Sequence, residues 1–450
     1  MPSPVSPTGG ERLQFADDLF LRRHRGLGSP VVNQFVWRRT TPVDRTRLDR
    51  FAAALAAGAL ARHARRPLLP GARWRWSTPA TLPAAEVAAP VPEAALGCWL
   101  AQCADGIDPA AGVSHRVAAA DLQAADGTPA GSVVVLSVSH SAADGAAMVE
   151  AVVRAACDLP PRPAPGVPAL PQRVAGDLAD IAGRAREIGA WARDRWGQRR
   201  TPAPATAPTP APALARPLPE AWALPVVVAE VDAARVADVA AAYGGTTNSW
   251  FVAAAARLSH AVGRIPTDQA VPVALPVSAR GADDPRANAT RIARVRLAPE
   301  VLGGRDGLAD LAAVRAACKA AYTELAATTP GAAPVPLALV QAMPDRLVGL
   351  LPQPPNAAVL ASNLAALDEA FVDAVGGDVR SVAAIAQQPG ATAEEVDAAG
   401  GGLALWSATA GGRTTLTVAG MDPARVESAD ELRAVVGEEL GRWGLEPVWW

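Results

Sequence analysis

The stretch that decides the fold runs from Val133 to Gly145 and reads Val-Val-Val-Leu-Ser-Val-Ser-His-Ser-Ala-Ala-Asp-Gly. Its apolar first part predicts a strand, and the following residues 146–153 have the pattern of a helix. His140 therefore stands where the strand ends and a turn begins, and Asp144 and Gly145 close that turn. The small residues beside His140 leave room for a substrate. Of the five histidines in the chain, only His140 has this setting.

Histidine suits acid–base chemistry because its unperturbed pKa lies near physiological pH, so it can accept and return a proton there. The local pattern alone leaves two interpretations open. In one, His140 is a catalytic base at the end of a strand. In the other, the segment is an ordinary strand, Asp-Gly turn and helix, in which the histidine is incidental.

The overall composition indicates a globular protein and gives no sign of a nucleic-acid partner. The 450 residues are 50% hydrophobic and 19% charged, enough for two or three domains or one large two-lobed body. The formal net charge of −2 provides no basic field, so we expect no binding to nucleic acid.

The sequence also carries no targeting or metal-binding pattern. Residues 1–10 lack the basic and apolar regions of a signal peptide, and no apolar run reaches about 18 residues. The cysteines fit no zinc spacing and are too few for a disulfide scaffold. We therefore expect a cytoplasmic enzyme with buried thiols and no metal. The cysteines are Cys98, Cys103, Cys157 and Cys318.

Two proline-dense segments, 158–172 and 202–218, interrupt the chain. Proline disrupts helices and central strands, so these segments are typical of exposed linkers. We predict an N-terminal lobe over residues 1–200, a Pro/Ala-rich linker over 201–220 and a C-terminal lobe over 221–450.

Strand and helix patterns alternate in both halves, which indicates two α/β lobes. Thr246-Thr247-Asn248 looks like the N-cap region of a helix from Trp250 to Val262, which is apolar all round and is therefore expected to be buried. Residues 174–198 predict an amphipathic helix whose basic face is either solvated or in contact with a membrane surface. The remaining predictions are strands at 31–37, 132–138, 226–231, 271–277, 292–297, 357–361, 403–408 and 414–419, and helices at 43–55, 233–243, 308–326, 335–349 and 428–443.

The spacing His-x-x-x-Asp-Gly over residues 140–145 resembles the core of the HHxxxDG motif. This motif belongs to acyltransferases that use thioesters, namely chloramphenicol acetyltransferase, the condensation domains of peptide synthetases, and the wax ester synthase/diacylglycerol acyltransferase family. Segments of the second half are similar to this group in the same order along the chain, and the resemblance covers roughly residues 14–445. The segments are 247–258 (an Asn-Asp motif opening a long helix), 272–280 (a Pro-Val-Ser-x-Arg strand), 287–290 (a Gly-Asn pair before a strand) and 359–363 (a Ser-Asn strand end).

The resemblance implies two chloramphenicol-acetyltransferase-like lobes, each a mixed sheet packed with helices, with the active site between them. It implies that His140 is the general base and that Asp144 pairs with an arginine, for which Arg280 is the candidate; helix capping by Asp144 is the alternative. Gly145 is expected to allow close backbone approach or positive φ. Candidate substrate-tunnel residues, each with a structural alternative, are Ser139, Asn248, Asn288, Ser362 and Asn363.

Three departures from the motifs bear on the acceptor. Ser139 replaces the first histidine, Ser249 replaces the aspartate of Asn-Asp, and Leu364-Ala365-Ala366 lacks the usual Pro-Gly. The chain looks most like the wax ester synthase/diacylglycerol acyltransferase branch. That likeness implies acyl-CoA as co-substrate, no bound cofactor, a fatty alcohol, diacylglycerol or similar acceptor, and contact with a membrane or lipid droplet. Two alternatives stay open: a condensation-type enzyme using a carrier-protein thioester to form an ester or amide, and an inactive scaffold of the same fold.

Overall fold

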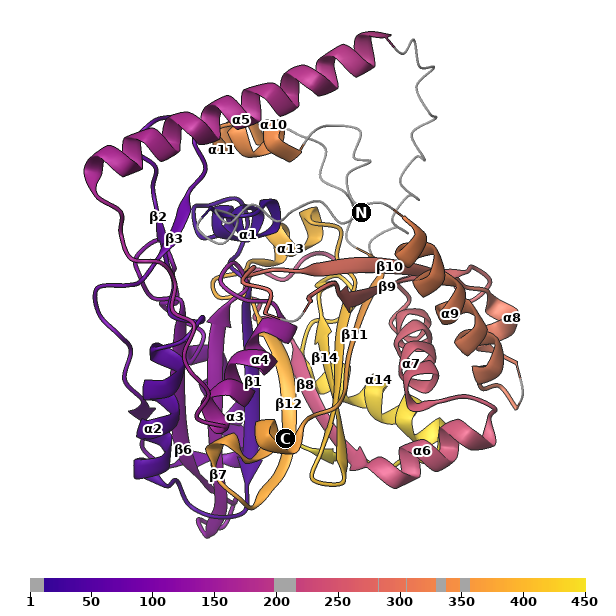
Figure 1. Ribbon diagram of the computed structural model, residues 1–450. Coiled ribbons are helices and arrows are strands. Elements are labelled where there is room, and N and C mark those ends of the chain that lie inside the picture. Colours follow the sequence, from indigo (N-terminus) through magenta and orange to yellow (C-terminus); the bar gives the residue numbers. More distant parts are fainter. Residues whose placement is uncertain (1–11, 198–215, 282, 305, 329–336, 349–356) are drawn as a thin grey trace.

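Two large mixed β-sheets, each covered by helices, form the two lobes of the chain (Figure 1). The computed structural model describes residues 12–197, 216–281, 283–304, 306–328, 337–348 and 357–450. The two-lobed α/β architecture expected from the sequence is confirmed. Among the described helices, none combines the length and the apolar composition that crossing a membrane requires.

The first sheet has the strand order β12-β1-β7-β6-β4, and β5 also pairs with β6. Helices α2 (Arg45–Ala56) and α4 (Gly145–Ala156) pack on one face of this sheet, and α3 (Leu96–Gln102) packs on the other. The strands are β1 (Val32–Arg39), β4 (Glu86–Val87), β5 (Val91–Pro92), β6 (His115–Gln123), β7 (Pro129–Ser139) and β12 (Val379–Gln387).

Strand β7 is buried on both faces, which explains its unbroken apolar run. Val134 and Leu136 belong to the core cluster beneath α2 and α4, together with Trp37 of β1. Val133 and Val135 alternate with them and face the opposite cluster, which also contains residues of the second lobe. Packing on both faces holds the end of β7 in place, so His140, which directly follows it, is positioned by a rigid element.

The second sheet has the order β10-β9-β11-β13-β14-β8-β15, and its core is built with helices α6, α7, α9 and α14. Helix α7 is buried along Trp250 to Ala256, as its all-round apolarity predicts. The strands are β8 (Val226–Asp232), β9 (Val271–Ser278), β10 (Thr290–Leu297), β11 (Val359–Ala366), β13 (Leu403–Ala410), β14 (Arg413–Gly420) and β15 (Val448–Trp449). The helices of this lobe are α6 (Ala233–Ala242), α7 (Thr247–Ala261), α8 (Pro299–Leu302), α9 (Leu311–Ala327) and α14 (Ala429–Arg442). Two short helices from the second half are α12 (Glu369–Val372), whose Phe371 packs in the core of the first lobe, and α13 (Ala393–Ala398).

The boundary near residue 200 does not separate the two sheets completely. Strand β12 comes from the second half, yet it pairs with β1 and forms an edge of the first sheet. The lobes are therefore joined by an exchanged strand as well as by the linker. Most of the predicted linker, residues 201–215, lies outside the described residues.

A third group of elements lies across one end of the molecule, at the top of Figure 1. It contains α1 (Phe15–Arg23), the pair β2 (His63–Arg65) and β3 (Arg75–Ser77), α5 (Leu170–Gly197), α10 (Leu337–Ala342) and α11 (Asp345–Val348). Asp177 of α5 is buried and bonds Arg12 at 2.7 Å and Arg75 at 2.9 Å, which fastens the helix to the first lobe. The single helix predicted at 335–349 is two short helices, because Pro344 cannot continue a helix.

Candidate active site

His140 is held on two sides by elements that are distant in sequence. Its backbone N–H donates to the carbonyl of Val31 at 2.9 Å, which fixes the turn after β7. Its imidazole stacks on Phe20 of α1, with ring centroids 3.9 Å apart and an interplanar angle of 12°. One face of the ring is therefore covered by Phe20.

The side chain of Asn288, just before β10, sets the tautomer of His140. Asn288 Nδ2 donates to Asp17 Oδ1 and to the His140 carbonyl, both at 2.9 Å, so its Oδ1 is the free acceptor. That Oδ1 lies 3.1 Å from His140 Nδ1, which must then carry the proton. Nε2 is left as the basic nitrogen, and no partner for it exists among the described residues.

Asp17, Asn288 and His140 form a hydrogen-bonded chain, and burial shifts the pKa of the titratable group at each of its ends. Desolvation lowers the pKa of His140, and the nearby Asp144 and the bond to Asn288 only partly offset it. Desolvation likewise raises the pKa of Asp17, against hydrogen bonds from Asn288 and the Gln14 backbone. The imidazole of His140 is therefore neutral at physiological pH and available as a base.

Asp144 fulfils both roles that its position suggests. It is only 2% exposed. Its Oδ1 caps α4 by accepting from the Ala147 N–H at 2.9 Å and also pairs with Arg280 Nη2 at 3.0 Å. Its Oδ2 accepts from the Ala289 N–H at 2.7 Å and from Thr290 Oγ1 at 3.1 Å.

These bonds lock the His140 turn of the first lobe to the β9–β10 connection of the second. The Asp144 N–H donates to the Ala287 carbonyl at 3.0 Å. Arg280 Nη1 donates to the carbonyls of Asp284 and Arg286, so the same guanidinium shapes the loop that carries Asn288. The base and the group that orients it thus come from different lobes and are placed by one ion pair.

Ser139 does not face a tunnel, because it is fully buried. Its hydroxyl lies 2.9 Å from His24 Nε2 and 2.9 Å from Ser141 Oγ. A histidine from the end of α1 therefore touches the residue that replaces the first histidine of the HHxxxDG pattern. This placement gives Ser139 a packing role beneath the His140 turn.

Gly145 has neither of the properties expected of it. Its φ is not positive, and a Cβ built on it would meet only Leu364 Cδ2 at 3.7 Å, an ordinary contact. Gly145 is the first residue of α4, directly after the Asp144 cap. The protein fold itself therefore does not require glycine here.

The remaining tunnel candidates form a separate group. Asn363 Nδ2 donates to Asn248 Oδ1 at 2.9 Å, which links β11 to the start of α7. The N-cap of α7 is Thr246, and Ser249 completes a capping box with it, so the serine that replaces aspartate has a local role. In the described part of the chain, no side-chain hydrogen bond joins Asn248, Ser362 or Asn363 to His140.

Three residues of the site were not identified from the sequence: Asp17, Phe20 and His24. All belong to α1 or its C-cap, a nine-residue helix. The one local signal was its capping box, in which Gln14 and Asp17 exchange bonds at the helix start. Chemically, the assembled site offers one neutral base, His140, which is hydrogen-bonded through Asn288 to the carboxyl group of Asp17. The adjacent Ser139 and Ser141 are too deeply buried to act as nucleophiles.

Comparison with known proteins supports the fold and does not extend to the reaction. No protein-family model and no curated protein matches the chain. Among solved structures, the wax ester synthase/diacylglycerol acyltransferase from Marinobacter aquaeolei VT8 is similar with a TM-score of 0.55, at 14% identity over 96% of this chain and 98% of that one. The chain shares the two-lobed fold of this protein.

Two condensation domains show the same extent of likeness. The condensation domain of the monacolin K polyketide synthase MokA gives a TM-score of 0.53 at 14% identity, over 96% of both chains. The first condensation domain of the CDA synthetase gives 0.53 at 15% identity, over 97% of this chain and 99% of that one. These structural similarities extend over both lobes, and therefore well beyond the motif at residues 140–145.

Proposed function

We propose that the chain transfers an acyl group from a thioester to a hydroxyl or amine acceptor, with His140 as the general base. The observation that carries the proposal is the state of the imidazole. Its Nδ1 is tied to Asn288, its pKa is lowered by burial, and its Nε2 has no partner among the described residues. That is the arrangement a base needs to accept a proton from a bound alcohol or amine.

The proposed reaction requires no covalent enzyme intermediate. His140 Nε2 takes the proton of the acceptor O–H or N–H while the oxygen or nitrogen forms a bond to the thioester carbonyl carbon. The carbon–sulfur bond then breaks, and the leaving sulfur receives the proton back from Nε2. The Nδ1–H bond to Asn288 supports the imidazolium between these two steps, and Asp17 behind it adds acceptor strength.

For the donor and acceptor we propose acyl-CoA and a lipid alcohol or diacylglycerol. The likeness to a solved wax ester synthase/diacylglycerol acyltransferase supports this pair. The alternative donor is a carrier-protein thioester in ester or amide formation, which the likeness to the two condensation domains supports equally. A lipid acceptor would also favour transient contact with a lipid surface, for which α5, exposing Leu170 and Leu178, is the candidate element.

The test is release of free thiol from acyl-CoA and from an acylated carrier protein, each crossed with alcohol, diacylglycerol and amine acceptors. His140→Ala should lose about 10²–10⁴-fold in turnover while remaining folded. His260→Ala is the matched control, because His260 is a half-buried histidine of the second lobe whose ring bonds the Gln269 carbonyl and no other group of the described residues. Acceptor-dependent release that is unchanged in His140→Ala would remove the assignment.

A further inference from the structure

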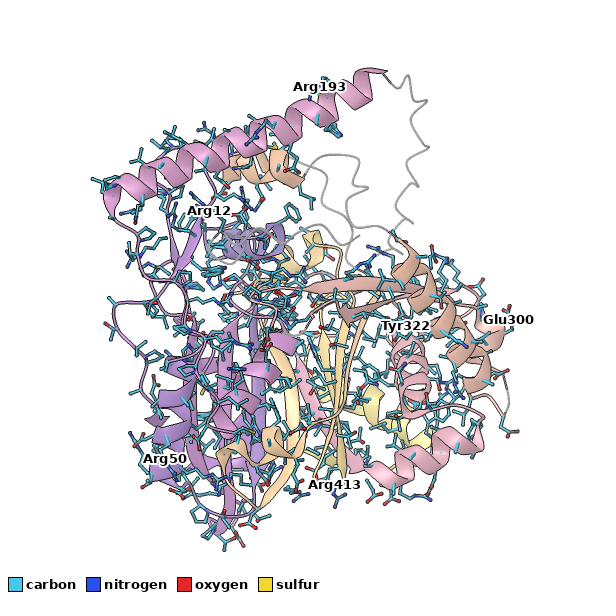
Figure 2. All side chains as sticks on the ribbon, in the orientation of Figure 1. Arg12, Arg50, Arg193, Glu300, Tyr322 and Arg413 are labelled. Carbon is cyan, nitrogen blue, oxygen red and sulfur yellow. The ribbon has the colours of Figure 1, made fainter. Side chains whose placement is uncertain are left out.

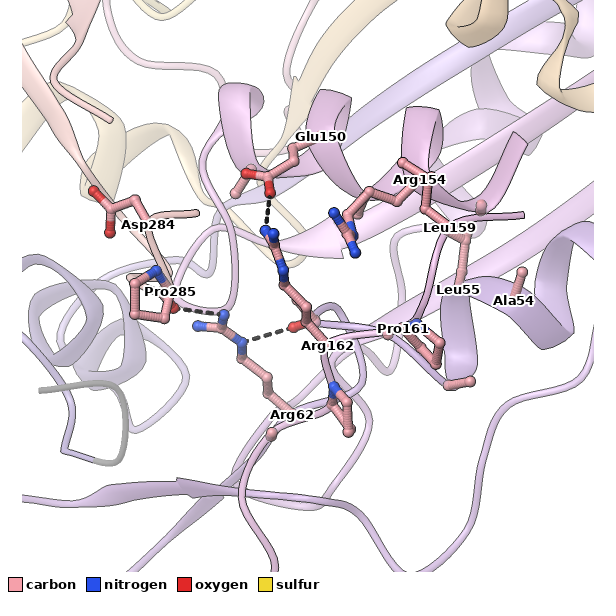
Figure 3. Close-up of a pocket in the computed structure, with 18 of the residues that line it drawn as sticks. Ala54, Leu55, Arg62, Glu150, Arg154, Leu159, Pro161, Arg162, Asp284 and Pro285 are labelled. Atoms are coloured by element: carbon pink, nitrogen blue, oxygen red, sulfur yellow. Dashed lines mark hydrogen bonds and ion pairs between the residues drawn. The ribbon is translucent and has the colours of Figure 1, made fainter. Parts of the chain in front are cut away.

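A pocket of about 510 Å³ lies behind the His140 turn, between α2, α4 and the loop that follows α4 (Figure 3). His140 does not line it. Arg280 does, so the ion-pair partner of Asp144 forms part of the wall of this pocket. Much of its wall is small and apolar: Ala54, Ala57, Gly58 and Ala59 from the end of α2, and Ala147, Ala151 and Ala155 from α4.

The polar part of the lining carries more positive than negative charge. Five arginines face three carboxylates there. Two of the arginines are neutralised within the wall, because Arg162 pairs with Glu150 at 2.7 Å and Arg286 pairs with Asp284 at 2.5 Å. Arg280 is engaged by Asp144. The groups left over are Arg62, Arg154 and the exposed carboxylate of Asp158, so one positive charge remains in surplus. Neither Arg62 nor Arg154 has an ion pair in the described part of the chain.

Arg62 is the unusual one, because it is only 7% exposed. Its Nε donates to the Ala59 carbonyl at 2.7 Å and its Nη2 to the Pro285 carbonyl at 3.0 Å, as drawn in Figure 3. Its Nη1 is buried without a hydrogen-bond partner. A buried guanidinium with an unused N–H group is costly unless an anion completes it.

We infer that this pocket binds a small amphiphilic anion, whose carboxylate or phosphate head group meets Arg62 and whose aliphatic part lies on the alanine walls. The unpartnered Nη1 supplies the donor, and two carbonyl bonds hold the guanidinium in place for a planar or tetrahedral oxyanion. The size and apolar walls suit a ligand larger than a free inorganic ion. The inference does not rest on the proposed acyl transfer, because no atom of His140 takes part in this site.

Calorimetric titration of the full chain with decanoate, decyl phosphate and decanol tests the inference. The two anions should bind, and decanol, which has the same chain without the charge, should bind at least about tenfold more weakly. The tighter anion identifies the head group as a carboxylate or as a phosphate ester. Absence of binding for both anions up to about 1 mM, or equal binding of decanol, would overturn the inference.

Two variants locate the ligand. Arg62→Gln should weaken anion binding about tenfold or more. Arg50→Gln, at an exposed position of α2 away from the pocket lining (Figure 2), should leave it unchanged. Ala151→Phe keeps every charge and fills the space beside α4, so it should also abolish binding even if Arg62→Gln folds poorly. Full binding by Ala151→Phe would contradict the placement of the ligand in this pocket.

Discussion

Removal of Arg280 should destabilise the protein far more than removal of His140, because Arg280 joins the two lobes at the site. In Arg280→Ala, the carboxylate of Asp144 stays 2% exposed and loses its only ion-pair partner in the described chain. The carbonyls of Asp284 and Arg286 also lose their donor. Breaking one side of a buried ion pair costs about 3–5 kcal/mol.

The structure places the expected cost near the lower end of that range. Asp144 keeps three other donors, the N–H groups of Ala147 and Ala289 and the hydroxyl of Thr290. We therefore expect a loss of about 3 kcal/mol in the free energy of unfolding, a large part of the 5–15 kcal/mol typical of a domain.

Urea denaturation followed by tryptophan fluorescence measures this loss. His140→Ala serves as the variant at the same site without a buried charge. Arg442→Ala breaks the solvent-exposed pair with Glu438 on α14 and should cost no more than about 0.5 kcal/mol. If Arg280→Ala lies within about 1 kcal/mol of the wild type, the ion pair does not hold the lobes together and the reasoning fails.

Three further predictions concern the site itself. Asn288→Ala should lower kcat by up to about 10²-fold and should shift the ¹⁵N resonances of His140 toward a mixture of tautomers; a purely structural role would leave the tautomer unchanged. Because burial lowers the pKa of His140 below 6.5, kcat/KM should stay constant down to about pH 6.5 and fall only in more acidic buffer. The free energy of unfolding should also fall in that acidic range, because the histidine of the unfolded chain takes up a proton at a higher pH than the buried one. Half-maximal activity above pH 6.5 would contradict this. Gly145→Ala should raise the free energy of unfolding by about 0.5–1 kcal/mol, since the site has room for a Cβ at an ordinary helical φ; a loss of activity without a loss of stability would show that a ligand, and not the fold, needs the glycine.

The sequence predicts those parts of the site that depend on local patterns of apolar and helix-capping residues. The run Val133–Leu136 is apolar at every position because β7 is buried on both faces, and Asp144 sits where a helix cap is expected. The buried helix α7 likewise follows from its composition. Arg280 as the partner of Asp144 came from the family resemblance, since nothing local joins residues 136 positions apart.

The parts that escape prediction depend on long-range contacts or on weak periodicity. Asn288 meets Asp17 across 271 positions, and α1 carries charged residues on much of its short length, so neither stands out in the sequence. Strand β12 is rich in alanine, which carries little strand signal, although it completes the first sheet. For Gly145 the motif predicts a conformational need that the structure does not have, because its φ is not positive and a Cβ would fit there.

The role of His140 as the base is tested by acceptor-dependent thiol release, measured side by side for wild type, His140→Ala and His260→Ala with acyl-CoA and with carrier-bound donors. We expect release by wild type and His260→Ala, and a loss of about 10²–10⁴-fold in His140→Ala at unchanged melting temperature. Equal release by all three proteins, or release by none of them with either class of donor, would contradict a role for His140 as the base of an acyl transfer.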